Sequence, residues 1–380
     1  MSTISYDFAI IGAGAAGLNL ALAMVEKPYF KEKTILILDP DEKIKNDKTW
    51  SFWEKDENKL EAIVVKKWSK AVFKDRNGKS ELLDLKPYSY KTIHALDFYN
   101  YAKNTLAQYT NILWEQTEVS GIENEEIIHT SETKYKIDTH IFDSRISGEF
   151  SADTSSTKLL QHFKAWVIET DEEYFDDSSF VMMDFNLVWK DTTSFTYILP
   201  YSTKKALIEF TFFSPDLVRE EDYDLMIERY IKENLNISEY VISGIEKGVI
   251  PMTDYPFHKA NSSKVTKIGT AGSWVKPSSG YSFRNAIHLS QRIVNNIAYN
   301  KPPARGLLSA KHRFYDALFL DVLYSKNHLG PDLFASMYQR NKVQKIFKFL
   351  NEETSFLEDL KIMSTFPKTP FTKALLGKIF

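Results

Sequence analysis

The chain has 380 residues and a mass of 44.0 kDa, a size that favours two lobes or one large α/β unit over a single small core. Hydrophobic residues make up 43% and charged residues 26%, which excludes a disordered or fibrous chain, and the net charge of −3 provides no basic field for nucleic acid. Cysteine is absent, which excludes disulfides, thiolate catalysis and cysteine-held metal clusters, and the eight histidines lack the spacing that would predict a metal site.

An uncharged run of eighteen residues lies close to the N-terminus and reads FAIIGAGAAGLNLALAMV, from Phe8 to Val25. A signal peptide would need a basic segment before this run, and the only charged residue there is Asp7. A membrane-spanning helix needs about 17 residues or more, so the run is just long enough, but its three glycines and Asn19 disfavour that interpretation. The third interpretation is a buried strand over residues 6–11, a tight turn, and a helix through Val25.

The third interpretation requires a second strand that ends in an acidic residue roughly 20 residues after the turn. Residues 34–38 read TILIL, and Asp39 follows them, 22 residues after Gly17. In such a turn Gly12 permits the tight bend, Gly14 lets the backbone approach a pyrophosphate, and Gly17 allows the helix to pack closely on the strand. Asp39 would accept hydrogen bonds from a ribose. The sequence therefore predicts a dinucleotide-binding fold rather than a membrane span.

A second strand, turn and helix follow much later in the chain. Residues 265–268 resemble a strand, residues 269–283 contain several Gly, Pro and Ser residues, and an apolar helical pattern begins at Phe283. In many flavoproteins a late unit of this kind returns to the nucleotide domain, and its helix N-terminus points at the flavin ring. The alternative is an ordinary strand–helix connection. Together with the N-terminal turn, this unit favours FAD over NAD.

Several further motifs are more particular than the glycine turn. They are NDKTWSFW at 46–53, FDSR at 142–145, QHF at 161–163, MMDF at 182–185, LIEFT at 207–211, IPMT at 250–253 and GTAGSWVKPSSGYSF at 269–283. In these motifs the chain resembles the lycopene β-cyclases of carotenoid-forming bacteria, and the resemblance covers essentially the whole chain. Two positions depart from related patterns. Thr270 stands where flavin hydroxylases have aspartate, which favours a cyclase, and Ser273 stands where cyclases often have glycine.

The resemblance implies an FAD enzyme that closes the linear ends of lycopene and other linear carotenoids into β-ionone rings. A proton adds to an end double bond, the carbocation closes the ring, and a proton is lost. Reduced flavin is implied as the active form and NAD(P)H as its reductant, with no net redox change in the product. The glycine turn and the resemblance together assign cofactor binding to Gly12, Ala13, Gly14, Gly17, Asp39, Lys48, Thr49, Gly272, Lys276, Ser279, Gly280 and Tyr281. For Lys276 a solvated surface position stays open as the alternative.

A single glutamate is the candidate acid. Alternation along residues 206–213 places Glu209 on one strand face with Leu207, Thr211 and Phe213, and such apolar neighbours keep a carboxyl protonated near neutral pH. The alternative is an ordinary solvent-facing glutamate, but its place in the LIEFT motif favours a catalytic role. The cyclase motifs also contain five aromatic residues, of which we expect only one or two to contact substrate: Trp50, Phe52, Trp53, Trp274 and Tyr281.

The substrate implies a cytoplasmic protein that binds a membrane surface peripherally, because lycopene dissolves in bilayers. Residues 340–380 carry eight basic and four acidic side chains, a net +4 against −7 for the remainder. Val343, Ile346, Phe347 and Leu350 form an apolar stripe beside basic residues, as expected of a helix on anionic lipid. The alternative is a helix packed on its own protein.

The predicted fold class is α/β, with a Rossmann-like FAD-binding domain, an antiparallel β-sheet substrate domain and a helical C-terminal region. The predicted boundaries are 1–145 and 264–300 for the discontinuous FAD-binding domain, 146–263 for the sheet domain, and 301–380 for the helices. Two other functions remain open on sequence grounds. One is an FAD-dependent monooxygenase of the hydroxylase type acting on an apolar substrate, and the other is a non-catalytic carotenoid- or nucleotide-binding protein.

Overall fold

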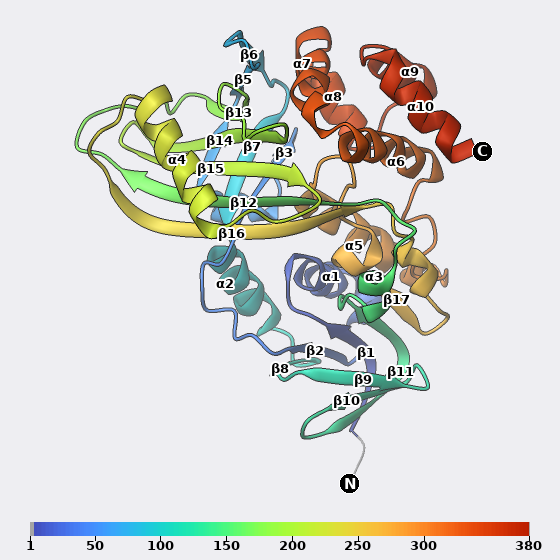
Figure 1. The fold of residues 1–380 in the computed structure, drawn as a ribbon. Coiled ribbons are helices and arrows are strands. Elements are labelled where there is room, and N and C mark those ends of the chain that lie inside the picture. Colours follow the sequence, from blue (N-terminus) through green and yellow to red (C-terminus); the bar gives the residue numbers. More distant parts are fainter. Residues whose placement is uncertain (1–3, 380) are drawn as a thin grey trace.

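The computed structural model describes residues 4–379, and these residues build two large sheets, one small sheet and a set of C-terminal helices (Figure 1). The predicted α/β class with a Rossmann-like domain is confirmed. Within residues 4–379 no helix combines the length and apolarity that a bilayer span requires.

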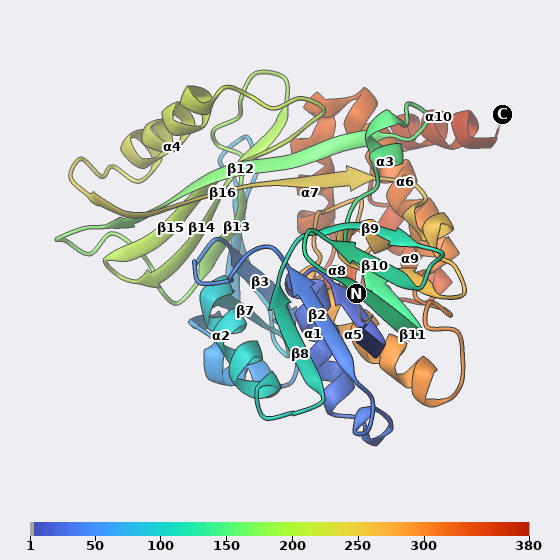
Figure 2. The ribbon, with the colours of Figure 1, turned by 90° about the horizontal axis from the view of Figure 1, so that it is seen from below.

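The first large sheet has seven strands and carries the glycine turn. Its strands, in spatial order, are β8 (Ile112–Gln116), β2 (Ile35–Asp39), β1 (Ile4–Ile11), β11 (Lys134–Asp143), β10 (Ile127–Thr130) and β9 (Val119–Glu123), and β17 (Val265–Lys267) also pairs with β11. Strands β8, β2, β1, β11 and β17 run parallel, whereas β10 and β9 form an antiparallel extension (Figure 2). Three helices, α1 (Ala15–Val25), α2 (Ala95–Leu106) and α5 (Phe283–Ala298), share one core with this sheet.

The burial of α1 explains why residues 8–25 look like a membrane span. Leu18, Leu20, Leu22 and Met24 are all buried, although they point to different sides of the helix, because the sheet, α2 and α5 surround it. A helix that is apolar all round is typical of such a protein interior as well as of a bilayer. The close approach depends on Gly17, where a Cβ would lie 1.9 Å from the carbonyl oxygen of Gly12.

The second large sheet also has seven strands and lies above the first sheet in the view of Figure 1. In spatial order they are β16 (Val241–Thr253), β12 (Lys158–Glu169), β15 (Lys205–Ser214), β14 (Thr193–Ser202), β13 (Phe180–Asp184), β5 (Lys70–Lys74) and β6 (Ser80–Asp84). Neighbours are antiparallel except for the β13–β5 pair. Helix α4 (Glu220–Asn234) packs on one face, and the C-terminal helices contribute to the core on the other.

The hairpin of β5 and β6 departs from the predicted boundaries. Residues 1–145 were expected to belong to the nucleotide domain, yet β5 completes its hydrogen bonding on β13 of the second sheet. Phe73 of β5 packs against Phe185, so side chains reinforce the pairing. A small third sheet of β3 (Thr49–Glu54), β7 (Ser89–His94) and β4 (Lys66–Trp68) comes from the same stretch of chain. Pairing between strands over 100 residues apart leaves no local signal in the sequence.

The C-terminal region is helical, as predicted, and consists of α6 (Ala310–Ser325), α7 (Gly330–Arg340), α8 (Val343–Leu350), α9 (Phe356–Met363) and α10 (Lys368–Ile379). The apolar stripe of α8 was expected to contact lipid, and that prediction is wrong. Val343, Ile346, Phe347 and Leu350 are buried, and the ring of Phe347 stacks on Trp53 with centroids 4.5 Å apart. The stripe is therefore part of the protein core, the alternative that the same amphipathic pattern left open.

Candidate functional site

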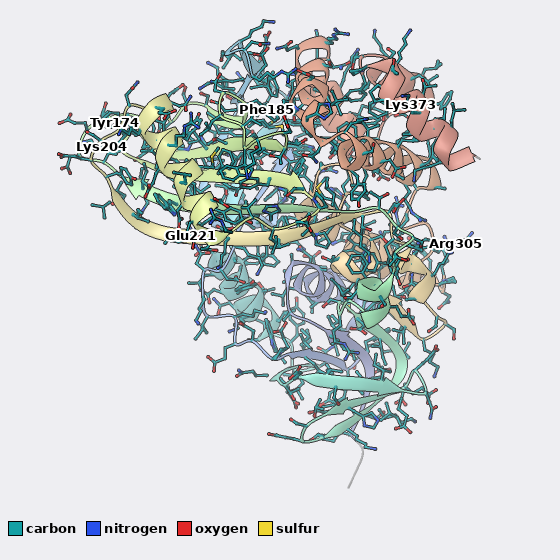
Figure 3. All side chains as sticks on the ribbon, viewed as in Figure 1. Tyr174, Phe185, Lys204, Glu221, Arg305 and Lys373 are labelled. Carbon is teal, nitrogen blue, oxygen red and sulfur yellow. The ribbon has the colours of Figure 1, made fainter. Side chains whose placement is uncertain are left out.

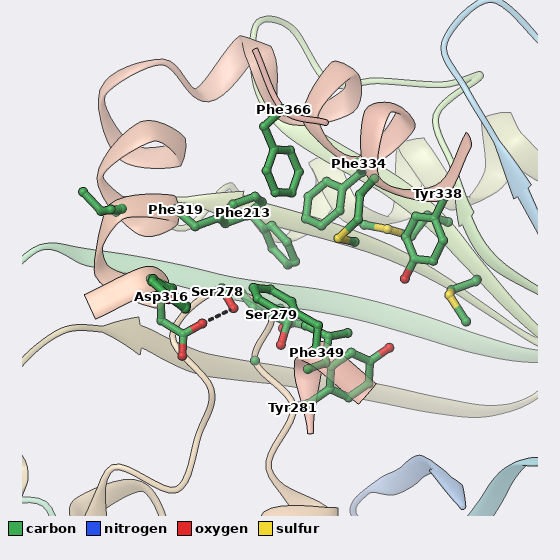
Figure 4. A pocket seen from close by; sticks show the side chains of 18 of the residues that line it. Phe213, Ser278, Ser279, Tyr281, Asp316, Phe319, Phe334, Tyr338, Phe349 and Phe366 are labelled. Carbon is green, nitrogen blue, oxygen red and sulfur yellow. Dashed lines mark hydrogen bonds between the residues drawn. The ribbon is translucent and has the colours of Figure 1, made fainter. Parts of the chain in front are cut away.

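A cavity of about 600 Å³ lies between the second sheet and the C-terminal helices. Its size is typical of a ligand site, and most of its wall is apolar. Rings from the sheet and from α6, α7 and the segment after α9 gather around it, as Figure 4 shows for Phe213, Phe319, Phe334 and Phe366. The only carboxyl groups among its lining residues are those of Glu209 and Asp316.

Glu209 lies on β15, on the cavity face predicted by strand alternation. Its neighbours Ile208 and Phe210 point to the opposite face, where they pack against α4. Burial raises the pKa of Glu209 to about 8, although a hydrogen bond from Thr211 Oγ1 to Glu209 Oε1 (2.5 Å) opposes the rise. The side chain keeps some accessible surface, but it is surface that borders the cavity rather than bulk solvent. Glu209 is therefore a neutral acid at pH 7.

Tyrosine side chains surround this acid. Tyr197 pairs with Glu209 across the β14–β15 ladder, and its hydroxyl lies 3.0 Å from that of Tyr90. Burial raises the pKa of Tyr281 to about 12 and also raises those of Tyr90 and Tyr197, so all three remain neutral. The sequence motifs had not marked Tyr90 or Tyr197. Of the five aromatic residues that the cyclase motifs contain, only Trp50 and Tyr281 line the cavity.

The glycine turn is built as predicted for an anion at a helix N-terminus. Gly12 has a φ of +100°, and Gly14 is the N-cap of α1, which has no side-chain cap and no acidic residue in its first turn. A Cβ at Gly14 would meet no heavy atom of the described chain within 4 Å apart from its own neighbours, so the space beside it is open. Helix α5 also begins without a side-chain cap or an acidic residue. Both N-termini thus present unpaired N–H groups, which suit a phosphate or another anionic group.

Asp39 ends β2, as predicted, but its carboxylate already has partners in the protein. It accepts hydrogen bonds from the backbone N–H of Ala13 (2.6 Å) and of Asp41 (2.8 Å), and Lys43 Nζ lies 3.1 Å away. Asp39 therefore fixes the glycine turn, and a carboxylate has further lone pairs with which it can accept a ribose hydroxyl.

The segment from Lys276 to Tyr281 forms a compact loop on the cavity wall. Gly280 has a φ of +71°, and its N–H donates to the carbonyl oxygen of Lys276 (2.8 Å). The positive φ favours glycine, and a Cβ here would also displace the side chain of Gln161, whose Oε1 lies 1.8 Å from the ideal Cβ position. Ser279 Oγ and Gln161 Oε1 are buried without a hydrogen-bond partner among the described residues, and they leave polar groups for a ligand. Gly272 is required by close packing, since its Cβ would lie 2.5 Å from the carbonyl oxygen of Lys267.

The two lysines predicted to contact a cofactor both form ion pairs within the protein. Lys276 is buried, and its ammonium is held by Asp316 (2.9 Å) and by Glu352 (3.4 Å), so it is neither a surface residue nor a free cation. Asp316 also accepts a hydrogen bond from Ser278 Oγ (2.6 Å), the dashed line in Figure 4. Lys48 is exposed and pairs with Asp47. Lys276 thus fixes the loop, with Asp316 as a partner that no sequence motif had indicated.

The structure divides the predicted site residues into two groups. Around the cavity it brings together Glu209, Thr49, Ser279, Gly280 and Tyr281. The turn residues Gly12, Ala13, Gly14 and Gly17, with Asp39, form a second cluster at the carboxyl ends of β1 and β2. Cofactors of α/β folds bind at such strand ends.

The fold and the site define a class of protein that combines a Rossmann-like sheet with a second, mostly antiparallel sheet, and the second sheet forms one wall of an apolar cavity. A family model described as "Lycopene cyclase protein" matches residues 7–376, so the chain belongs to the lycopene cyclase family. No protein with a curated description matches it.

Solved structures share this fold at low sequence identity. A geranylgeranyl bacteriochlorophyll reductase-like protein from Thermoplasma acidophilum has a TM-score of 0.62 at 12% identity, over 98% of this chain and 99% of the other. The flavin-dependent brominase Bmp2 has a TM-score of 0.59 at 14% identity, over 98% and 99%. The tetrameric form of 2-methyl-3-hydroxypyridine-5-carboxylic acid oxygenase has a TM-score of 0.58 at 10% identity, over 92% and 96%. At these identities the similarity concerns the fold.

The raised pKa of Glu209 predicts how stability depends on pH. The folded chain holds a proton up to about pH 8, whereas the unfolded chain releases it near pH 4.5, so stability falls as pH rises between these values. Glu209→Gln removes this dependence. The free energy of unfolding of the variant minus that of wild type should increase by up to about 1.4 kcal/mol for each pH unit across that range. Urea denaturation at several pH values measures both free energies. The exposed Glu173→Gln is the control. A difference between Glu209→Gln and wild type that is constant with pH would contradict the assignment.

Proposed function

We propose that this protein is a lycopene β-cyclase, which converts the linear ends of lycopene into β-ionone rings and so forms γ-carotene and β-carotene. The observation that carries the proposal is a neutral, enclosed glutamic acid on the wall of an apolar, aromatic cavity, in a chain of the lycopene cyclase family. Ring closure by this route is an isomerisation, which places the enzyme among the isomerases.

The residues of the cavity suit each step of the reaction. Glu209 donates its proton to the terminal double bond of the substrate, and the Glu209 carboxylate that remains is a base for the proton lost after ring closure. The apolar walls exclude the water that would otherwise capture the carbocation. The ring faces of Trp50, Tyr197 and Tyr281 can stabilise the cation by ~0.5–2 kcal/mol each.

FAD is the proposed cofactor, and the residues present fit it. The N–H groups at the start of α1 and the open space at Gly14 suit its pyrophosphate, and Asp39 suits its ribose. Thr49, Ser279, Gly280 and the N-terminus of α5 suit the ring system beside the cavity. When bound and reduced, with NAD(P)H as reductant, FAD would supply negative charge next to the cation. Lys276 is proposed to hold the loop rather than to contact the cofactor, because Asp316 and Glu352 occupy its ammonium.

Expression in cells that accumulate lycopene tests the activity. Wild type should convert lycopene to cyclic carotenoids of unchanged mass, and Glu209→Gln should lower the rate by about 10²–10⁴-fold while retaining FAD, because only the proton donor is lost. Glu173→Gln is again the control. Product analysis by chromatography and mass spectrometry separates the alternatives. A monooxygenase would add oxygen and consume O₂, and a binding protein would leave lycopene unchanged; either result would refute the proposal.

The pyrophosphate assignment has its own test. Gly14→Val should fold normally, because apart from its own neighbours no heavy atom of residues 4–379 lies within 4 Å of the added Cβ. It should purify without FAD, because the valine fills the space for the phosphates. The absorbance of bound flavin and the melting temperature of the apoprotein measure the two effects. Gly121→Val in β9 is the matched control, since a Cβ there also meets open space. A Gly14→Val protein that is folded and fully loaded would place the pyrophosphate elsewhere.

Peripheral binding to anionic lipid is also part of the proposal, and it concerns the last part of the C-terminal tail, residues 356–379. The cavity wall continues to Phe356 and Leu360 of α9 and to Leu375 of α10. Exposed apolar side chains stand beside this part of the wall: Phe356 is 58% exposed, Leu357 76% and Leu376 50%. Lys361, Lys368 and Lys373 are exposed on the same two helices and make no ion pair among the described residues, and Figure 3 places Lys373 at the outer edge of the helical region. Apolar and basic side chains together match an anionic bilayer surface.

The double variant Phe356→Asp with Leu357→Asp should sediment less with phosphatidylglycerol-containing vesicles than wild type, by several-fold, because it removes apolar contact and adds negative charge. Ile245→Asp on β16 is the matched control, since Ile245 is 62% exposed and is not one of the residues that line the cavity. Equal sedimentation of wild type and the double variant would exclude this surface.

A further inference from the structure

A second carboxyl group lies on the same sheet face as Glu209. Ala165 of β12 pairs with Glu209 of β15 on one side and with Glu246 of β16 on the other. Residues that pair directly point to the same face, so these three side chains form one row across the sheet. Adjacent strands are ~4.8 Å apart, so the two glutamate Cα atoms are about 10 Å apart with only a methyl group between them.

The two glutamates differ in their hydrogen-bond partners. Glu246 Oε1 accepts the backbone N–H of Thr49 at 2.8 Å, a bond that favours the ionised carboxylate, and the ammonium of Lys48 is nearby. Glu209 has only the hydroxyl of Thr211. Burial raises the pKa of both groups, and at Glu246 the hydrogen bond from Thr49 and the charge of Lys48 oppose the rise. When environments separate two carboxyls in this way, one is the acid and the other stays charged.

The other titratable groups around the pair do not supply a competing charge. Tyr90, Tyr197, Tyr201 and Tyr281 come from β7, β14 and the loop before α5, and burial raises the pKa of each, so they are neutral at the working pH. Asp47 and Lys48 lie beside Glu246 and pair with each other. Glu246 is therefore the charge that acts on Glu209.

We propose that Glu246 is a positioning residue of this site, an ionised carboxylate that keeps the proton on Glu209 and tethers Thr49 at the cavity wall. The inference rests on the proposed function and adds a residue to it. In the reaction, the Glu209 proton passes to the terminal double bond of the substrate and leaves Glu209 as a carboxylate. The charge of Glu246 then makes the Glu209 carboxylate a stronger base, which reclaims a proton from the ring. The protons balance without exchange with solvent.

Infrared spectroscopy tests this without substrate. A protonated carboxyl group has a characteristic C=O stretching band. The band that wild type shows and Glu209→Gln lacks reports the protonation of Glu209. The pH at which this band loses half its intensity, its midpoint, can then be measured in each variant. In Glu246→Gln, which keeps an oxygen for Thr49 but loses the charge, the midpoint should move to lower pH by roughly one pH unit, as expected for a unit charge at this separation in a protein of effective dielectric constant near 20. Glu246→Asp keeps the charge and should keep the midpoint near that of wild type.

Three outcomes would overturn the inference: a midpoint in Glu246→Gln equal to that of wild type, an equal shift in Glu246→Asp and Glu246→Gln, or a high-pH limb of cyclisation that does not follow the infrared midpoint. The equal shift would show that altered packing, not charge, moves the proton. If Glu246→Gln shifts the midpoint as expected and no protein form cyclises lycopene, the proposed function fails while the coupling of the two glutamates stands.

Discussion

Holding a proton on Glu209 at neutral pH is the constraint on which the rest of this site depends. An exposed carboxyl would be ionised and could not donate, so the chain must enclose Glu209 away from bulk water. The enclosure has a thermodynamic consequence: the folded state carries a neutral acid that the unfolded state would ionise, so the site lowers stability as pH rises. If Glu209 is catalytic, wild type is expected to be less stable than a variant that lacks this acid, because function then requires a group that lowers stability.

The enclosure is assembled from three parts of the chain. The second sheet provides the row that holds Glu209 and Tyr197, the C-terminal helices provide the opposite wall, and the loop before α5 closes the side towards the nucleotide domain. Lys276 and Asp316 join the loop to α6 by a buried ion pair. Such a pair adds little net stability, yet breaking it by removing one partner costs about 3–5 kcal/mol, because the other charge stays buried alone. The pair therefore fixes where the loop sits rather than how stable the fold is.

Local patterns in the sequence were sufficient for the elements whose signal is local. The glycine turn, the strand that ends at Asp39, the alternation around Glu209 and the helix that begins at Phe283 all lie where periodicity and turn residues predict them. What local patterns could not provide is pairing between distant segments. The attachment of β5 to β13, the ion pair of Lys276 with Asp316, and the row that joins Glu246 to Glu209 each connect residues at least 37 positions apart. The sequence indicates which residues of β16 share a face with Glu246: they are Gly244, Gly248 and Ile250, at every second position. It does not indicate which strand pairs with β16, so it does not connect Glu246 to Glu209.

The C-terminal helices show why an amphipathic pattern alone cannot locate a lipid surface. The stripe of α8 has the stronger periodicity and basic flanks, and it is core, whereas α9 and α10 have weaker patterns and carry the exposed apolar side chains. The basic side chains of the C-terminal tail also differ in their surroundings. Lys348 pairs with Glu358, and Lys378 pairs with Asp254 and Asp321, so part of the basic excess of the tail holds helices in place. Of the basic side chains that remain exposed, Lys361, Lys368 and Lys373 lie on α9 and α10, whereas Arg340, Lys342 and Lys345 lie at the end of α7 and the start of α8. For the proposed cyclase, a substrate that enters beside α9 and α10 would pass from lipid into a cavity whose wall is also mostly apolar.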